Sequence, residues 1–251
     1  MTTSKNQVTS KIFIAIILCF SLISGWVKPV RAETLTWTGN MSSAWNSIGN
    51  WSPAQIPNAS DTVIISSTTT NDPVIPISYA ALASSITIQT GGKLTLSNNG
   101  SISAGGLIIA AGGELVTADE SETTINLTGT LENHGTFSSR GQLVINAAAS
   151  TNDGTIICSG NYYSFIPIIG FNAPFNNAGT VDIQNGHVDL KYGGTHTGTF
   201  TGSTSNTGSW AGLWLGSESV SGQTFTFLAG SAITLPRLVT DSDAVVNIFG
   251  T

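Results

Sequence analysis

The sequence has few charged residues and very few basic ones. Charged side chains make up 9% of the 251 residues, against roughly 25% in ordinary globular proteins. Half of the eight Lys and Arg residues lie between positions 1 and 32, so four basic residues face fourteen acidic ones in the remainder, a net charge of −10. This balance excludes a basic nucleic-acid-binding surface. The low content of charged side chains also excludes a coiled coil.

The sequence has only two cysteines, and it lacks metal-binding spacings and nucleophile motifs. Cys158 is the only cysteine after position 32, which excludes a disulfide framework. It follows a strand-like run, so we expect a buried inert thiol, with a reactive or intermolecular thiol as the alternative. The three histidines have no metal-binding spacing, and neither a Gly-x-Ser-x-Gly motif nor a phosphate-binding loop is present. We therefore expect no catalytic residue, metal or cofactor.

The segment 1–32 has the three parts of a secretory signal peptide. Lys5 and Lys11 supply the positive start, positions 12–23 an apolar run, and Val30-Arg31-Ala32 a small-residue cleavage site. The apolar run is too short for a membrane span, which needs ~20 residues. We predict cleavage after Ala32, a secreted or cell-surface location, and membrane contact during export only.

Beyond position 33 the apolar residues alternate with polar ones rather than following a helical period. Five short runs show this alternation: 93–96, 124–127, 180–183, 187–190 and 224–227. Such alternation is typical of strands with one buried face. The sequence therefore predicts an all-β protein.

Turn motifs recur along the chain at a regular interval. Asn-x-Gly-Thr begins at Asn133, Asn152 and Asn177, and Gly-Gly pairs precede the strands at Lys93 and Glu114. The interval is within the range of stacked repeat units, whose period is roughly 20 to 50 residues. We expect Gly and Asn at these turns because they tolerate positive φ, and we expect stacked Asn side chains to hydrogen-bond to one another. The period favours a right-handed parallel β-helix, or β-solenoid, with a β-sandwich as the alternative because its hairpins also use Asn-Gly turns.

Residues 33–78 form a different, tryptophan-rich block. Trp37, Trp45 and Trp51 are followed by Pro57 and the run Asp61-Thr62-Val63-Ile64-Ile65. We interpret the three tryptophans as a cap that covers the first coil of the solenoid, with a sugar-stacking platform as the alternative. We predict three segments: a signal peptide (1–32), a Trp-rich cap (33–78) and solenoid coils (79–251).

This block, with the Gly-Gly and Asn-x-Gly-Thr turns that follow it, resembles the start of secreted bacterial β-helix surface proteins of the autotransporter-passenger and adhesin-like kind. The resemblance covers most of residues 34–200. It implies a surface-exposed right-handed β-helix with a role in adhesion and without catalysis. Such proteins are usually longer and end in a barrel or sorting signal, so the resemblance is to a truncated or freely released member.

Two groups of residues are candidates for ligand binding. Trp210 and Trp214 would either pack beneath a late loop or present a flat face to a sugar. Asp182, His187, Asp189 and Lys191 form the densest ionisable group, and we expect the two aspartates to share one solvent face. The predicted function is a structural, adhesin-like surface protein that contacts host or surface glycans or proteins. The alternative is a carbohydrate-binding or polysaccharide-lyase-like β-helix. The sequence predicts no oligomeric state.

Overall fold

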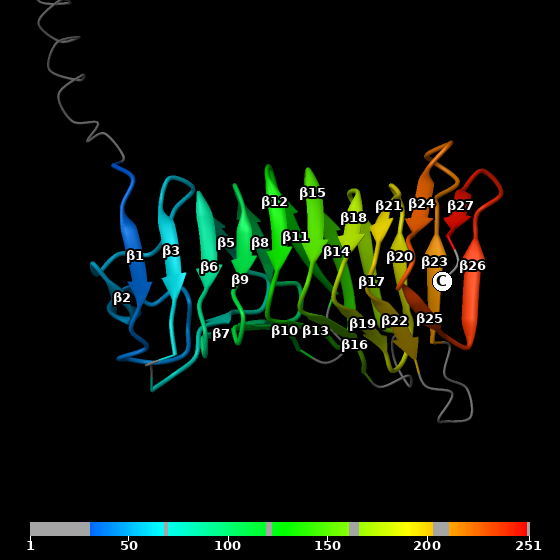
Figure 1. Cartoon of the computed structure of the whole chain (residues 1–251). Coiled ribbons are helices and arrows are strands. Elements are labelled where there is room, and N and C mark those ends of the chain that lie inside the picture. The colour runs from blue at the N-terminus through cyan, green and yellow to red at the C-terminus, as the bar shows by residue number, and fades with distance from the viewer. Residues whose placement is uncertain (1–30, 68–69, 119–121, 161–165, 203–210, 250–251) are drawn as a thin grey trace, which may run out of the picture. The chain divides into compact units, whose positions relative to one another are not determined.

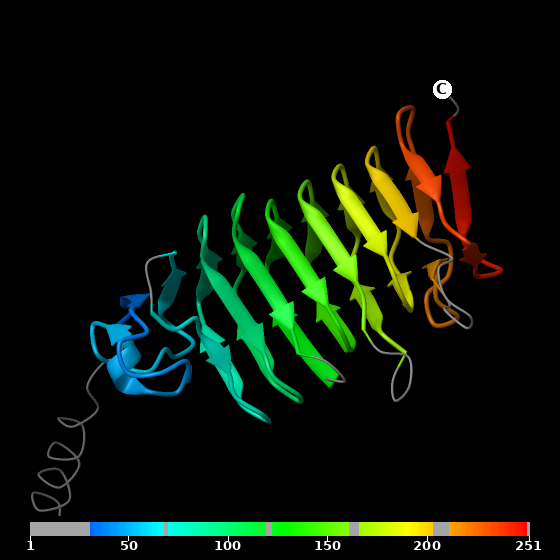
Figure 2. The same cartoon turned by 90° about the horizontal axis from the view of Figure 1, so that it is seen from below.

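The computed structural model describes residues 31–67, 70–118, 122–160, 166–202 and 211–249. It separates Met1–Ala32 from one compact unit, Glu33–Thr251. The predicted signal peptide therefore lies almost entirely outside the described residues. Its strands wind through three sheets and stack in sequence order, as Figures 1 and 2 show. The parallel β-helix expected from the sequence is confirmed.

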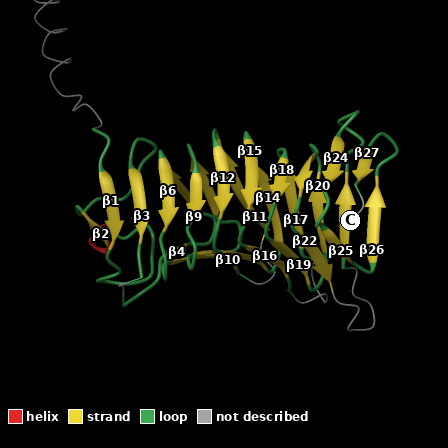
Figure 3. Ribbon diagram, in the orientation of Figure 1, coloured by secondary structure: helices red, strands yellow, loops and turns green. Residues whose placement is uncertain are grey.

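Within the described residues, sheet A has eleven strands, and sheets B and C have eight each, so the chain completes about eight turns. In spatial order, sheet A contains β2 (Trp51–Ser52), β1 (Thr34–Trp37), β3 (Thr62–Ile65), β6 (Ser85–Ile88), β9 (Leu107–Ile109), β12 (Thr130–Asn133), β15 (Ala149–Asn152), β18 (Phe175–Asn177), β21 (Gly194–His196), β24 (Thr224–Phe227) and β27 (Val245–Ile248). Sheet B contains β4 (Val74–Ile75), β7 (Lys93–Leu96), β10 (Glu114–Thr117), β13 (Thr136–Ser139), β16 (Thr155–Cys158), β19 (Thr180–Ile183), β22 (Thr199–Gly202) and β25 (Ala232–Thr234). Sheet C contains β5 (Ala80–Ala83), β8 (Ser101–Ala104), β11 (Glu122–Leu127), β14 (Gln142–Asn146), β17 (Ile168–Asn172), β20 (His187–Leu190), β23 (Gly212–Leu215) and β26 (Arg237–Thr240). Figure 3 shows these strands joined by loops, with a 3-10 turn, η1 (Ile48–Asn50), near the N-terminus of the unit.

Each coil runs from sheet A to sheet B to sheet C, and each strand pairs in parallel with the equivalent strand of the next coil. The apolar positions of the alternating runs all point inward. Leu94, Leu115, Phe137, Ile156 and Val181 illustrate this: they follow one another in register through sheet B, and each is at most 1% exposed. The core is therefore one continuous column of stacked side chains.

The Asn-x-Gly-Thr turns form the corner between sheets A and B. The side chains of Asn133, Asn152 and Asn177 are buried there and form a ladder, with Nδ2 of Asn133 donating to Oδ1 of Asn152 at 2.6 Å and Nδ2 of Asn152 donating to Oδ1 of Asn177 at 2.7 Å. Each Nδ2 also donates to a backbone carbonyl of the following coil, at Thr155, Thr180 and Thr199 respectively. The stacking of asparagines expected from the sequence is confirmed.

We expected glycine at this corner because of a positive φ, and this expectation is wrong. Gly154 is absent from the positive-φ residues of the described chain, which do include Gly91 and Gly112 of the longer Gly-Gly corners. A Cβ on Gly154 would instead lie 2.2 Å from the carbonyl oxygen of Gly135, and a Cβ on Gly179 would lie 2.1 Å from that of Gly154. Successive corners approach so closely that no side chain fits between them.

The tryptophan block closes the N-terminal end of the solenoid, as predicted. Trp37 and Trp45 both contact Trp51 edge to face, with ring centroids 4.9 and 4.8 Å away, and all three rings are at most 3% exposed. β2 pairs antiparallel with Thr36 and Trp37 of β1 and so covers part of the edge of this strand. The rings have no exposed face for a sugar, so the structure supports the cap and not the platform. The predicted boundary at residue 78 stays a prediction.

Candidate functional site

The outer face of sheet C carries the candidate interaction surfaces of this protein. Its outward side chains form rows that cross the coils, because parallel strands in register place equivalent residues about 4.8 Å apart. One row runs from Leu82 through Ser103, Asn126 and Asn146 to Asn172. A groove lies at one end of this face, and the ionisable residues singled out in the sequence lie at the other.

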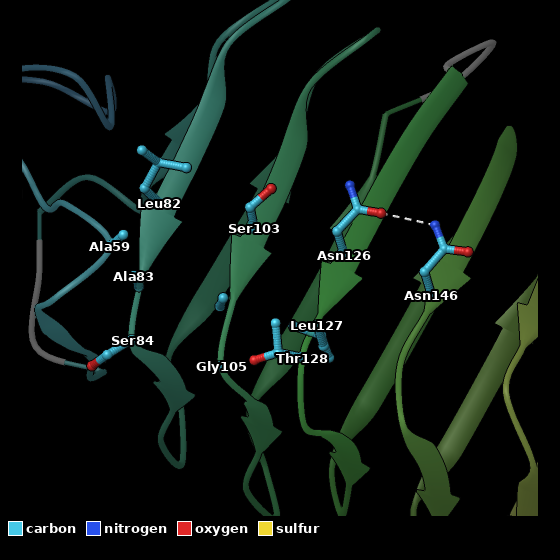
Figure 4. A pocket seen from close by; sticks show the side chains of 11 residues that line it. Ala59, Leu82, Ala83, Ser84, Ser103, Gly105, Asn126, Leu127, Thr128 and Asn146 are labelled. Atoms are coloured by element: carbon cyan, nitrogen blue, oxygen red, sulfur yellow. Dashed lines mark hydrogen bonds between the residues drawn. The ribbon is translucent and has the colours of Figure 1, made fainter.

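The groove spans the first coils of sheet C and has a volume of about 520 Å³. Small or apolar side chains form much of its lining, and hydroxyl and amide groups complete it, as Figure 4 shows. It is lined by Ala59, Leu82, Ala83, Ser84, Ser103, Ala104, Gly105, Asn126, Leu127, Thr128 and Asn146. No charged residue is among them, so the groove suits an uncharged ligand with both polar and apolar surface.

A second asparagine ladder runs from this groove across the sheet. Nδ2 of Asn146 donates to Oδ1 of Asn126 at 2.8 Å, and Nδ2 of Asn172 donates to Oδ1 of Asn146 at 2.9 Å. Unlike the corner ladder, this one lies on the outer face, where its remaining donors and acceptors are open to a ligand. The hydrogen bonds hold the amides in fixed orientations along the groove. A ligand therefore meets a preorganised row of hydrogen-bonding groups.

His187 and Asp189 lie side by side on β20 at the far end of the same face. Nε2 of His187 is 3.4 Å from Oδ1 of Asp189. Desolvation, with a contribution from the charge of Arg237, lowers the pKa of His187 from 6.5 to about 4. Desolvation also raises the pKa of Asp189 from 3.8 to about 6, against the opposing effect of Lys191. Burial thus disfavours the charged form of both groups, and both shifts weaken an ion pair at this contact.

The indole of Trp214 completes this cluster. It stacks on the ring of His187 with centroids 4.3 Å apart and planes within 9°, and the guanidinium carbon of Arg237 lies 5.9 Å from its centroid. Register places His187 in the preceding coil and Arg237 in the following one, on either side of Gly212. A Cβ on Gly212 would lie 3.3 Å from Nε1 of Trp214, so the ring leans over this glycine. Trp214 is half-buried, and the ring of His187 covers one of its faces.

The other predicted residues do not all join this cluster. Lys191 follows β20 and acts on Asp189 through its charge. Asp182 lies on β19 in sheet B, where its Oδ2 accepts a hydrogen bond from Gln184 at 2.8 Å. The corner at residues 184–186 separates it from Asp189, so the two aspartates do not share a face. Trp210 lies outside the described residues.

Sequence reasoning missed the groove and the outer asparagine ladder. A usable signal was present, because Asn126, Asn146 and Asn172 recur at intervals close to those of the turn motifs. Within the described residues, no group of three or more His, Cys, Asp or Glu side chains is placed to hold a metal ion. The same residues include no helix with the length and apolar character that a membrane crossing requires.

Comparison with known families gives one match. A family model described as a domain of unknown function (DUF8693) matches residues 36–145. The matched region runs from the Trp cap to β14 and contains most of the lining of the groove. No curated protein matches the chain, and no solved structure matches it.

Proposed function

We propose that this chain is a secreted or cell-surface structural protein of the adhesin-like kind, which presents binding surface and does not catalyse a reaction. One observation carries the proposal: the solenoid holds long rows of uncharged polar side chains at a fixed spacing on its outer faces. Thr136, Thr155, Thr180 and Thr199 form such a row on sheet B. The row from Ser103 to Asn172 on sheet C is the second.

The groove on sheet C is the part of this surface best suited to a specific ligand. Its hydroxyl and amide groups both donate and accept hydrogen bonds, as sugar hydroxyls do, and its apolar residues suit the C–H faces of a sugar ring. Its lining has no charge, which favours neutral over acidic glycans. The predicted signal peptide and the resemblance to bacterial surface β-helices support the location.

A glycan array probed with the purified chain tests this function. We expect binding to neutral oligosaccharides that changes little between low and high salt, because screening weakens contacts between charges and not contacts with a neutral ligand. Ser103→Trp, which fills the groove, should abolish the binding. Ser138→Trp makes the same change on the outer face of sheet B and should leave binding intact.

Two outcomes would contradict the proposal. Equal binding by both tryptophan variants would remove the groove as the binding site, and no binding by the unmodified chain would remove the glycan as the ligand class. Release of unsaturated products from acidic polysaccharides in the presence of calcium would instead support the lyase-like alternative. That activity would have to arise near His187 and Asp189, and His187→Ala would then abolish it.

A further inference from the structure

The outer asparagine ladder gives the binding face of sheet C a direction and a repeat. Ser103, Asn126, Asn146 and Asn172 occupy the same register position on β8, β11, β14 and β17, which belong to four successive coils. Their row runs along the solenoid axis, because the coils stack in that direction (Figure 2). A ligand that lies along this row therefore crosses the strands and meets one polar side chain of the row in each coil.

The amides of the ladder keep hydrogen-bonding capacity after their contacts with one another are counted. An asparagine amide offers two N–H donors and two acceptor lone pairs. Asn146 uses one donor, to Oδ1 of Asn126, and one lone pair, which accepts from Nδ2 of Asn172. One N–H and one lone pair of this half-buried side chain remain. A ligand with the same hydrogen-bonding groups in every unit can therefore make similar contacts in successive coils.

The uncharged polar row ends in a different kind of residue on each side. Leu82 precedes Ser103 in the row, and its apolar side chain is 40% exposed. The pairing of β17 with β20 places Lys191 after Asn172, so a charged side chain follows the last amide. The part of the row that suits a neutral hydrogen-bonding ligand therefore covers four coils.

We propose that this face binds a linear, β-1,4-linked neutral glycan that lies along the solenoid axis, with one sugar unit on each of the four coils. This inference rests on the proposed function, because it specifies the ligand of the same groove. Pyranose units joined through opposite sides of the ring form an extended chain that advances by one ring length per unit. This advance is close to the ~4.8 Å spacing of the coils, so each unit presents its hydroxyl groups to one side chain of the row.

An extended peptide fits this repeat less well than such a glycan does. The side chains on one face of an extended peptide recur at every second residue, about 6.6–6.8 Å apart. A peptide along the solenoid axis would therefore move out of register with the row after one or two coils. The spacing of the row thus favours the glycan.

Calorimetric titration of the purified chain with β-1,4-linked oligomers of glucose and of mannose, in increasing lengths, tests the inference. We expect the affinity to rise with each added unit, up to about four units, and then to level off, because the row covers four coils. Each added unit should contribute roughly fivefold, as for one neutral hydrogen bond. The α-1,4-linked oligomers of glucose are the matched control, since they have the same composition but form coiled chains. They should bind no more tightly than a short β-linked oligomer.

Asn172→Ala tests how many coils the ligand contacts. Asn172 ends the ladder and does not line the groove itself. The variant should weaken binding of a four-unit oligomer about fivefold and leave binding of a two-unit oligomer unchanged. Asn176→Ala makes the same substitution on the outer face of sheet A and should change neither affinity. Equal losses for the short and the long oligomer would overturn the arrangement of one unit per coil.

The outcomes separate this inference from the proposed function. If affinity did not depend on length or linkage, yet was lost in Ser103→Trp, the groove would remain a glycan site and the axial arrangement would be overturned. The same conclusion would follow if the array showed groove-dependent binding only to glycans other than the β-1,4-linked oligomers. No binding to any glycan would remove both proposals, and binding of an extended peptide in their place would overturn the ligand class.

Discussion

At the scale of single residues, the corner glycines show that close approach and not backbone conformation selects glycine. Gly154 donates its N–H to the carbonyl oxygen of Asn133 at 3.0 Å while the carbonyl oxygen of Gly135 occupies the space that a Cβ would need. The backbone ladder of the sheets thus continues around the corner from coil to coil. Any side chain here forces two coils apart, and this strain spreads along both of them.

Gly154→Ala should therefore destabilise the chain by roughly 3 kcal/mol, in the upper range of overpacking substitutions. Urea unfolding followed by circular dichroism measures the change. Gly170→Ala is the matched control, because its Cβ would meet nothing closer than the carbonyl oxygen of Leu143 at 3.8 Å. Equal effects of the two substitutions would contradict the role of close approach.

His196 occupies the ladder position that Asn177 holds one coil earlier. Its ring is fully buried among Phe175, Phe200 and Phe227. Burial lowers the pKa of His196 from 6.5 to about 4. The unfolded chain therefore binds a proton more readily than the folded chain, and the stability that depends on neutral His196 is lost as the pH falls from 6.5 toward 4.

His196→Asn should reduce the loss of stability between pH 7 and pH 5 by about 2 kcal/mol. Comparing unfolding free energies at the two pH values isolates this effect from any change in packing, which is present at both. The unmodified chain, measured at the same two pH values, is the reference. His187 contributes in the same direction, whereas Asp189, with its raised pKa, stabilises the fold as the pH falls below 6. An unchanged pH dependence in His196→Asn would contradict the assignment.

At the scale of elements, one residue type serves two purposes in this solenoid. The corner ladder is buried, and Asn152 there donates to Asn177 and to the carbonyl oxygen of Thr180 while accepting from Asn133. The ladder of Asn126, Asn146 and Asn172 has the same side-chain contacts on the outer face. Water can replace a lost hydrogen-bond partner only in this outer ladder.

Asn152→Ala should consequently cost about 3 kcal/mol of stability, because it leaves several buried polar groups without partners. Asn146→Ala, the same substitution in the outer ladder, should cost less than about 1 kcal/mol. Thermal unfolding of the two variants side by side measures the difference. Similar losses of stability in both variants would show that burial does not determine how much an asparagine ladder stabilises the fold.

The strands themselves could be predicted from the sequence, because apolar and polar residues alternate in step with buried and exposed positions along a strand. The runs 93–96 and 224–227 became β7 and β24 with the same bounds. The distribution of residues over three sheets could not be predicted, since it depends on where short corners fall. Asp182 and Asp189 were expected on one face, but Gly186, with a φ of 84°, turns the chain between them. The groove was likewise hidden, because it arises where the small residues Ala83 and Ala104 stack at successive corners.

At the scale of the whole molecule, each coil is stabilised by contacts with its neighbours. The terminal coils therefore affect the stability of the chain more than the ends of a globular domain do. The Trp cap covers the first coil, and β2 pairs with part of the edge that β1 would otherwise present. Of the three rings, Trp51 contacts both others and donates Nε1–H to the carbonyl oxygen of Trp45 at 2.8 Å. It is therefore the residue on which the cap depends most.

Trp51→Ala should destabilise the chain by about 3–5 kcal/mol, as for other buried aromatic truncations, and should promote association through the exposed end. Unfolding measurements give the first effect and light scattering the second. Trp214→Ala is the control, since that ring packs on an outer face, and it should cause a smaller loss without aggregation. Absence of association in Trp51→Ala would argue that the cap stabilises the coil without protecting its edge.

The reactivity of the buried thiol of Cys158 can report when the coils of the solenoid open. Cys158 is fully buried and hydrogen-bonds to the carbonyl oxygen of Asn185, and burial, with the charge of Asp189, raises its pKa above the usual range. A thiol reagent should therefore react with Cys158 only when the middle coils open, so the labelling rate counts opening events. We expect slow labelling at neutral pH, rapid labelling in denaturant, and an accelerated rate in Gly154→Ala, whose strain lies next to β16. Fast labelling of the unmodified chain would mean that the solenoid opens in the middle and not only at its ends.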